Sequence, residues 1–252
     1  MNLNTLFVGN VVQHFEALPS TNAYATELLA KTAPNEGTVI SAGYQKAGRG
    51  QIGSSWTASA GKNLLLSVIL YPRWLVAQQQ FLLSRAVALA VADTITHYVD
   101  GEAQVKWPND VYFGDKKLAG ILIQNSLSGK YLQWSVVGIG LNVNEAAFPT
   151  DLPKASSMFL STGQKFDLVE VQQTLFKRLE QRYLQVKNKP SITRAEYLQN
   201  LYRYQEWHHF QMVENGQAFL GQIIGVQENG KLAIQKQGSG VQYFDLKEVA
   251  FI

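Results

Sequence analysis

The sequence predicts an α+β protein in two parts, a strand-and-helix part over residues 1–204 and a small β-barrel over residues 205–252. Three observations lead to this prediction. In the first part, apolar runs of strand length alternate with amphipathic helical stripes. From about residue 205 the helical periodicity stops, and short alternating segments are separated by Asn-Gly turns. The 252 residues are also enough for one large core and one small one.

Composition narrows the class of protein. A hydrophobic content of 46% with 16% charged residues is typical of a globular chain. A net charge of +3 is weak support for nucleic-acid binding. The chain has no cysteine, which excludes disulfides, thiolate metal sites and cysteine nucleophiles. No signal peptide or membrane span is visible, so we expect a cytoplasmic protein with no membrane partner.

The first elements along the chain are a short strand at 11–18 and a helix that starts at Ser20-Thr21-Asn22 and ends near Pro34. Serine and asparagine at a helix start are ordinary N-cap residues. The same groups can also hold a polar ligand, and the residues alone leave both roles open.

A glycine-rich loop follows, from Gly43 to Trp56, between a strand at 37–42 and a buried strand at 63–70. Glycines on both sides of Arg49 let the backbone come close to a ligand, and the guanidinium offers a planar fork of donors to a phosphate or carboxylate. The loop lacks the Gly-Lys-Ser/Thr ending of a P-loop and leads into a strand, not a helix.

The middle of the chain predicts a helix over 74–99, a hairpin over 105–123 and a strand over 131–143. Gly114-Asp115 is the expected hairpin turn. Pro108 cannot sit in a central ladder, so we expect a corner there. Two glycines at period two in the last strand indicate that a group packs flat against that face, with a neighbouring helix as the ordinary alternative.

The remaining first part predicts a loop over 148–161, an amphipathic helix over 167–187 and a second short helix over 191–202. In the second part, turn signals at 214–216, 228–230 and 238–240 predict hairpins. The length of residues 205–252 and their short strands separated by turns are typical of an SH3-like barrel.

Taken together, these segments resemble bacterial biotin protein ligases. The resemblance rests on the motifs Ser20-Thr-Asn, Gln45-Lys-Ala-Gly-Arg-Gly, Lys106-Trp-Pro-Asn-Asp, Lys117-Leu-Ala-Gly and Gly138-Ile-Gly-Leu-Asn in this order. It implies a class II synthetase-like catalytic domain with a mixed sheet and packed helices, followed by an SH3-like barrel. It also implies that ATP and Mg²⁺ are used to convert biotin into biotinoyl-AMP, and that a lysine of a biotin carboxyl carrier protein is then acylated.

Carried over by position, the resemblance implies a role for each matching residue. Lys117 would lie between the biotin carboxylate and the α-phosphate, Arg49 would close over the phosphates, and Asp110 would lie beside the reacting phosphate, with magnesium as the candidate bridging ion. Trp56 would stack on adenine, while Asn109 and Asn142 would bond its edge. The biotin site would be formed by Ser20, Thr21, Asn22, Gln45, Gly48, Gly120, Gly138 and Gly140. Metal ligands are not identified.

The chain departs from the family pattern in two places. Gln51 and Ser54 stand where members of the family often have two further loop arginines, which predicts a looser grip on pyrophosphate or the adenylate. Only nineteen residues precede Ser20, so we expect no winged-helix module and no DNA binding. The oligomeric state stays open, with a homodimer among the alternatives. Two other functions are also retained: a lipoate or octanoate protein ligase, and a non-catalytic biotin or nucleotide sensor.

Overall fold

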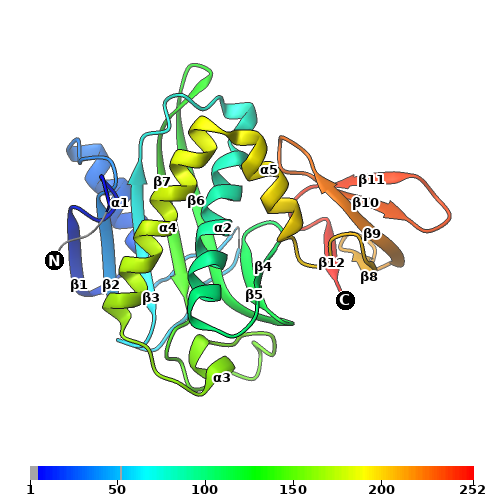
Figure 1. Ribbon diagram of the computed structural model, residues 1–252, viewed down its shortest axis with the longest axis horizontal. Helices are drawn as coiled ribbons and strands as arrows, with labels where there is room; N and C mark the ends of the chain where they lie inside the picture. The colour runs from blue at the N-terminus through cyan, green and yellow to red at the C-terminus, as the bar shows by residue number, and fades with distance from the viewer. Residues whose placement is uncertain (1–4, 52) are drawn as a thin grey trace.

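A computed structural model describes residues 5–51 and 53–252 of the chain. Its larger part is a seven-stranded mixed sheet in the order β1-β2-β3-β7-β6-β5-β4, in which only β1 and β2 run parallel (Figure 1). The strands are β1 (Val12–Leu18), β2 (Val39–Gln45), β3 (Leu64–Leu70), β4 (Ala103–Lys106), β5 (Asp110–Phe113), β6 (Lys116–Ser128) and β7 (Tyr131–Leu141).

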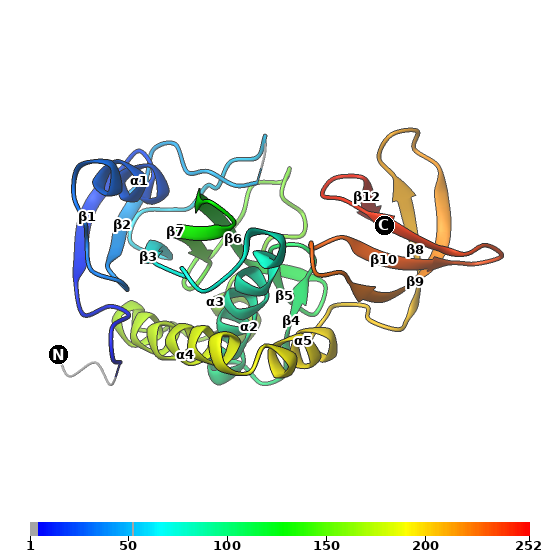
Figure 2. The same cartoon turned by 90° about the horizontal axis from the view of Figure 1, so that it is seen from above.

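Helices cover both faces of this sheet. Its helices and single 3₁₀ turn are α1 (Thr21–Lys31), η1 (Ala77–Gln79), α2 (Phe81–Tyr98), α3 (Met158–Thr162), α4 (Leu168–Asn188) and α5 (Pro190–Gln199). Seen from above, α2 lies between the sheet and the α4–α5 pair, while α1 lies on the opposite face (Figure 2). Because α2 is covered on two sides, most of its residues are buried, and they form the main apolar core with the sheet.

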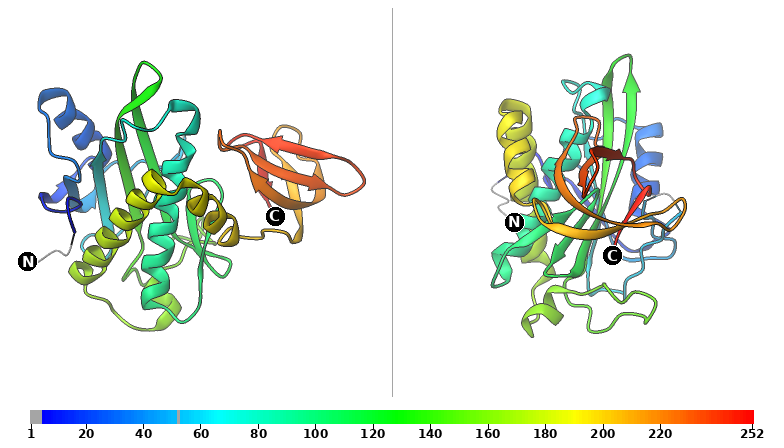
Figure 3. Two further views of the ribbon diagram at one scale, coloured as in Figure 1. Left: turned by 45° about the horizontal axis from the view of Figure 1, so that its top comes forward. Right: turned by 90° about the vertical axis from the view of Figure 1, so that its right-hand side faces the viewer.

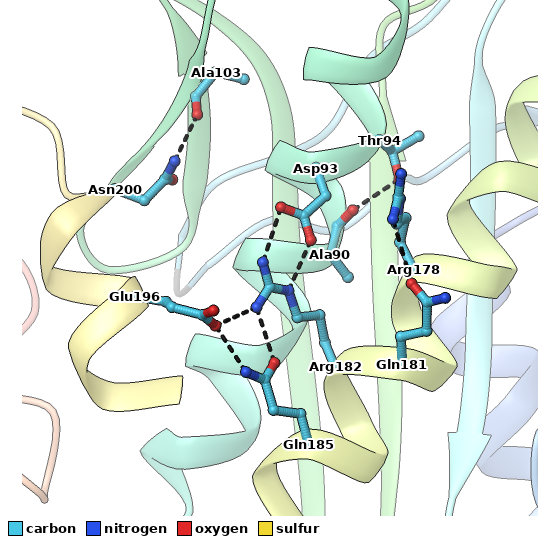
Figure 4. Close-up of polar contacts among 10 residues, drawn as sticks. All are labelled: Ala90, Asp93, Thr94, Ala103, Arg178, Gln181, Arg182, Gln185, Glu196 and Asn200. Atoms are coloured by element: carbon cyan, nitrogen blue, oxygen red, sulfur yellow. Dashed lines mark hydrogen bonds and ion pairs between the residues drawn. The ribbon is translucent and has the colours of Figure 1, made fainter. Parts of the chain in front are cut away.

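The helical layer is fixed by one charged network (Figure 4). Arg182 on α4 donates to both carboxylate oxygens of Asp93 on α2, at 2.7 and 3.0 Å, and also pairs with Glu196 on α5. Gln185 donates to the same Glu196 at 2.8 Å. A bidentate Arg–carboxylate pair is directional, so these contacts set how the three helices meet.

The second part is a curved five-stranded antiparallel sheet in the order β11-β10-β9-β8-β12 (Figure 3). Its strands are β8 (Trp207–Met212), β9 (Ala218–Val226), β10 (Leu232–Lys236), β11 (Val241–Phe244) and β12 (Val249–Phe251). The predicted α+β class, with a mixed sheet followed by a small β part, is confirmed. The turn residues Gly216, Gly230 and Gly238 all have positive φ, the conformation for which the sequence supplies glycine.

The turn between β9 and β10 is held by the first part of the chain. Trp107 Nε1 donates to Gly230 O at 2.8 Å, and Arg85 Nη2 donates to Val226 O at 2.7 Å. Arg85 is only 3% exposed, so its guanidinium depends on these barrel carbonyls for hydrogen bonds. The position of the small sheet is therefore fixed by buried contacts.

Several element boundaries differ from the sequence predictions; for example, α5 ends at Gln199 and not at residue 202. Helix α2 begins at Phe81, not at residue 74, because residues 75–77 pair with the end of the β6–β7 hairpin. Strand β2 continues to Gln45 because β1 provides a parallel partner. The short helix α3 lies in the segment predicted as loop, and Ser157 caps it.

Candidate functional site

A cavity of about 220 Å³ lies beside the N-terminus of α1. It brings together most of the residues that the resemblance singles out: Ser20, Thr21, Asn22, Gln45, Arg49, Trp56, Asn109, Asp110, Lys117, Gly120, Gly138 and Gly140. They come from α1, β2, the glycine-rich loop, the β4–β5 corner, β6 and β7. Segments far apart in the sequence thus form one site.

One part of the cavity wall is polar and uncharged. Thr21 donates its backbone N–H to Gln45 Oε1 at 2.7 Å, and Ser67 Oγ lies 2.8 Å from Thr21 Oγ1 and 2.6 Å from Asn22 Oδ1. Asn22 Nδ2 donates to Gln124 Oε1 at 3.1 Å. Thr21, Asn22 and Ser67 are at most 3% exposed. Their hydrogen bonds fix them in place, so this uncharged cluster can present oriented donors and acceptors to a neutral polar ring.

A second part of the wall is charged. Lys117 Nζ lies 2.6 Å from Asp110 Oδ1 and 5.7 Å from the centre of the Trp56 ring. Both members of the pair are partly exposed, with side chains 31% and 18% accessible. The backbone of Lys117 is fixed on two sides, because it pairs with Tyr112 in β5 and donates its N–H to Lys154 O. The cation is therefore aimed into the cavity by a rigid strand.

Two glycines on β7 also line the cavity. A Cβ on Gly138 would come within 2.2 Å of Asn22 Oδ1, and a Cβ on Gly140 within 2.4 Å of the Trp56 ring. On Gly140 the predicted flat packing is confirmed by the Trp56 indole, whereas on Gly138 the neighbour is a side chain of helix α1, the ordinary alternative. Residues two apart on a strand are about 6.6 Å apart. Asn22 and Trp56 therefore lie over neighbouring same-face positions of β7.

The glycine-rich loop folds back on itself so that Trp56 enters the cavity. Trp56 donates its N–H to Gly48 O at 3.0 Å, and Arg49 pairs with Ser55. A Cβ at Gly48 would lie 2.3 Å from Trp56 O, so only glycine permits this close backbone approach. Gly48 itself lies behind the cavity, while the exposed Arg49 lines it.

Asn142 lies outside the main cavity, in a neighbouring pocket of about 100 Å³ with Phe148 and Leu152. Trp56 and Lys117 line both spaces. The Oδ1 atom of Asn142 is buried and has no hydrogen-bond partner, although Nδ2 donates to Ser156 O at 2.9 Å. An unpaired buried acceptor is costly, so it marks a place for a ligand donor.

Asn109 and Asn142 are therefore not brought together. Asn109 lines the main cavity, and its Nδ2 already donates to Ile121 O at 2.9 Å. The Trp56 Nε1 atom is also buried without a partner, so it is a second group that a ligand could satisfy.

Sequence reasoning did not identify four residues at or beside the site. Ser67 is the single polar residue of β3, so a polar residue in an otherwise apolar strand was a usable signal. Glu145 accepts from Ser59 N and from Asn63 Nδ2, both at 2.9 Å, and so fixes the exit of the glycine-rich loop. No motif marks it. The two other residues, Leu246 and Lys247, reach the cavity from the β11–β12 turn of the barrel, and no local pattern predicts that contact.

Within the described residues there is no group of three or more histidine, cysteine, aspartate or glutamate side chains able to hold a metal ion. Among the residues that the structure describes, Asp110 is the one carboxylate that lines the cavity. Residues 5–51 and 53–252 also contain no helix long and apolar enough to cross a membrane.

Residues 14–142, just over half of the chain, match the biotin/lipoate A/B protein ligase family. Among curated relatives, the chain is 29% identical over 93% of its length to the bifunctional ligase/repressor BirA of Bacillus spizizenii, of which it covers 72%. The chain is also 33% identical to the bifunctional ligase/repressor BirA of Bacillus subtilis, over 72% of this chain. The match spans 56% of that relative, little more than half of its length. The chain is 34% identical over 71% of its length to the biotin–[acetyl-CoA-carboxylase] ligase of Mycobacterium tuberculosis, of which it covers 66%.

The fold is similar to that of solved biotin protein ligases. The biotin protein ligase from Aquifex aeolicus in complex with biotin and ATP superposes with a TM-score of 0.77 at 25% identity, over 96% of this chain and 98% of that one. The family match runs from within β1 to the end of β7, and this part of the chain contributes most of the cavity. The chain belongs to the biotin/lipoate A/B protein ligase family.

Proposed function

We propose that this protein uses ATP to convert biotin into biotinoyl-AMP and then transfers the biotinyl group to a lysine of a biotin carboxyl carrier protein. The observation that carries the proposal is the layout of the cavity. A neutral hydrogen-bonding cluster lies against Gly138, the Trp56 indole lies against Gly140, and the Lys117–Asp110 pair lines the same cavity. Biotin has the matching layout, with a neutral ureido ring joined to a carboxylate by a short aliphatic chain.

The uncharged cluster is assigned to the ureido ring. That ring has N–H donors and a carbonyl acceptor, and the cluster offers hydroxyl and amide groups of both kinds from Ser20, Thr21, Asn22 and Gln45. The glycines leave room for the bicycle, and Gly120 lies in the same wall. A lipoyl ring or an octanoyl chain would leave these buried groups unpaired, which favours biotin over the lipoate alternative.

The charged pair is assigned to the first reaction. The biotin carboxylate attacks the α-phosphate of ATP and pyrophosphate leaves, so negative charge accumulates where two anions meet. A cation fixed at that point stabilises the transition state more than the separated substrates. We assign this role to Lys117, whose ammonium is oriented by Asp110, and we place Arg49 over the phosphates.

Magnesium fits the available residues in one way. This ion is commonly held by one or two carboxylates together with substrate phosphates and water. Asp110 offers such a carboxylate, so it would share the ion with the nucleotide, and Asn109 lies beside it at the reaction centre. Bound magnesium would neutralise charge on the phosphates.

The neighbouring pocket is assigned to adenine. Trp56 separates this pocket from the main cavity and offers an aromatic face, while the unpaired Oδ1 of Asn142 can accept from the exocyclic amino group. We therefore place the adenine edge at Asn142 and assign Asn109 to the phosphate region instead.

Several accompanying proposals follow from the same assignment. The catalytic domain would span residues 1–204 and the SH3-like barrel residues 205–252; Gln205 N already bonds Ile223 O of the barrel. We place the protein in the cytoplasm, where ATP is supplied. The net charge of +3 is small, which favours a protein that does not bind operator DNA. Size measurement with and without biotin would decide between monomer and homodimer.

Mass spectrometry tests the function directly. Purified protein incubated with biotin, ATP and Mg²⁺ should yield biotinoyl-AMP, and addition of a carrier domain should add one biotin to one lysine. Repeating the assay with lipoate in place of biotin tests the alternative that the protein is a lipoate ligase. Binding of biotin without pyrophosphate release would instead favour the sensor.

A further inference from the structure

Lys106 is the first residue of the Lys-Trp-Pro-Asn-Asp motif, and the assignments above give it no role. It ends β4, where it pairs with Asp110 of β5 across the antiparallel ladder. Residues directly opposite each other on such a ladder have their side chains on the same face of the sheet. Lys106 therefore shares a face with the carboxylate that lines the main cavity, although it is not among the described residues of the cavity wall.

Asp110 lies between two lysines. On one side, Lys117 of β6 forms the ion pair already described, with Nζ 2.6 Å from Oδ1. On the other side, the strand order β6-β5-β4 places Lys106 next to Asp110 on the strand farther from Lys117. One carboxylate is thus flanked by two cations, of which Lys117 is the one that lines the cavity.

The ammonium of Lys106 is held by aromatic rings. Its Nζ lies 5.1 Å from the centre of the Tyr112 ring and 4.9 Å from that of the Phe251 ring, both within the ~6 Å reach of a cation–π contact. Among residues 5–51 and 53–252, this ammonium has no ion-pair or hydrogen-bond partner. Because aromatic rings restrict a cation without neutralising it, the charge of Lys106 remains available to Asp110.

The electrostatics of Lys106 show that it interacts with Asp110. Burial lowers the pKa of Lys106, whereas the attraction of Asp110 raises it. Repulsion from three further cations, Lys154, Lys117 and Arg203, lowers it as well. A charge that is partly removed from water acts through a lower effective dielectric constant and is less screened by salt. The field of Lys106 at Asp110 is therefore stronger than that of an exposed lysine at the same distance.

We propose that Lys106 is a positioning residue for the formation of biotinoyl-AMP. It compensates the charge of Asp110 from the neighbouring strand, so that the Lys117 ammonium is available to the biotin carboxylate and the α-phosphate. This inference rests on the proposed function. The Lys117–Asp110 pair alone presents no net charge to two incoming anions, because the carboxylate cancels the ammonium. With Lys106 included, the group carries a net positive charge before the substrates arrive, as electrostatic preorganisation requires.

The test separates the charge of Lys106 from its packing. Lys106→Met keeps an unbranched side chain without the charge, and Lys106→Arg restores a cation between the rings. Lys130→Met is the matched control, because Lys130 makes the same kind of contact, 5.4 Å from the Tyr131 ring, at an exposed position beside β7. For each protein, biotinoyl-AMP formation is measured in a single turnover, together with the Kd for biotin and the midpoint of urea unfolding.

Lys106→Met should slow biotinoyl-AMP formation by about ten- to hundredfold, the scale observed for groups that orient the ligands of metal sites from behind. The Kd for biotin should not change, because the ureido ring lies at the uncharged cluster. Lys106→Arg should recover a large part of the rate, and Lys130→Met should match the unmodified protein. Full activity of Lys106→Met would overturn the proposal, as would a folded Lys106→Arg variant that is no faster than Lys106→Met.

A double-mutant cycle identifies the residue through which Lys106 acts. Because the proposed effect passes through Asp110, Lys106→Met should cost much less in an Asp110→Asn background than in the unmodified protein. Equal losses in the two backgrounds would overturn the proposal, since Lys106 would then act independently of Asp110. Absence of any biotinoyl-AMP from the unmodified protein would instead reject the proposed function.

Discussion

Lys117 and Asp110 form an ion pair, with Nζ 2.6 Å from Oδ1, at the wall of the main cavity. The preceding residue, Lys116, is exposed and donates to Pro153 O at 2.7 Å. Neighbouring residues on a strand point to opposite faces. Lys117 therefore lies at the cavity, while Lys116, one position earlier, lies at the surface. This pair of lysines provides a matched comparison.

Lys117→Ala should slow biotinoyl-AMP formation by roughly 10²–10³, the effect of removing one preorganised electrostatic group. Lys116→Ala should be nearly silent, because its ammonium bonds only an exposed carbonyl. Single-turnover measurement of both variants side by side is the check. Lys117→Arg should recover part of the rate, because the positive charge is retained while the planar guanidinium differs in shape from the ammonium. A defective Lys116 variant beside an active Lys117 variant would mean that the roles are reversed.

Gly140→Ala should raise the KM for ATP and lower stability by about 1–3 kcal/mol, the usual cost of overpacking. The added methyl group would lie 2.4 Å from the Trp56 ring, so the indole, which lines both the main cavity and the pocket proposed for adenine, must move. Gly225→Ala, a strand position with nothing within 4 Å of the new Cβ, is the control. Equal behaviour of the two variants in ATP titrations and thermal unfolding would contradict the Trp56–Gly140 contact.

The sequence predicted the two-part α+β fold and the family because the relevant signals are local. Motif residues such as Lys117 and Gly138 lie in short runs with regular strand periodicity, and the Gly114 turn follows from hairpin chemistry. The flat packing on Gly140 was also predictable, since paired glycines in a strand leave space that a neighbouring group must fill.

The contacts that were missed are all between distant segments. Lys247 reaches the cavity because Arg85 and Trp107 orient the barrel, and those two residues are more than a hundred positions away from it. Helix α2 begins late because tertiary pairing with the β6–β7 hairpin takes its first predicted residues. The separation of Asn109 from Asn142 likewise depends on the path of the sheet, which no local pattern encodes.

Gln51→Arg should slow the release of biotinoyl-AMP from the enzyme by about ten- to hundredfold. Gln51 lines the main cavity near Arg49, and a guanidinium there could make a charge-assisted hydrogen bond to a phosphate, worth about 1.5–3 kcal/mol. Gln51→Met keeps the length without the charge and should not slow release. Release can be timed by rapid filtration of the preformed complex. An unchanged rate in the arginine variant would mean that the phosphate lies out of reach of position 51.

Glu145 is the buried carboxylate that fixes the exit of the glycine-rich loop, and its ionisation should make that anchoring depend on pH. Burial raises the pKa of Glu145, but the hydrogen bonds from Ser59 and Asn63 and the nearby Lys62 cation outweigh it, so the net pKa lies below the ordinary value. A depressed carboxyl pKa contributes stability above the unfolded-state value of about 4.3, and that contribution is lost as the pH falls through the folded-state pKa.

Glu145→Gln should therefore lower the free energy of unfolding by about 1.5–3 kcal/mol at pH 7, the value of hydrogen bonds to a charged group. The difference from the unmodified protein should shrink as the pH falls below about 4.3, because the native carboxyl then becomes protonated too. Glu27→Gln is the control, since Glu27 pairs with Lys31 on the exposed surface of α1 and such pairs contribute little. Urea unfolding of the three proteins at several pH values provides the measurement. A gap that widens toward acid pH would show that Glu145 does not anchor the loop through its charge.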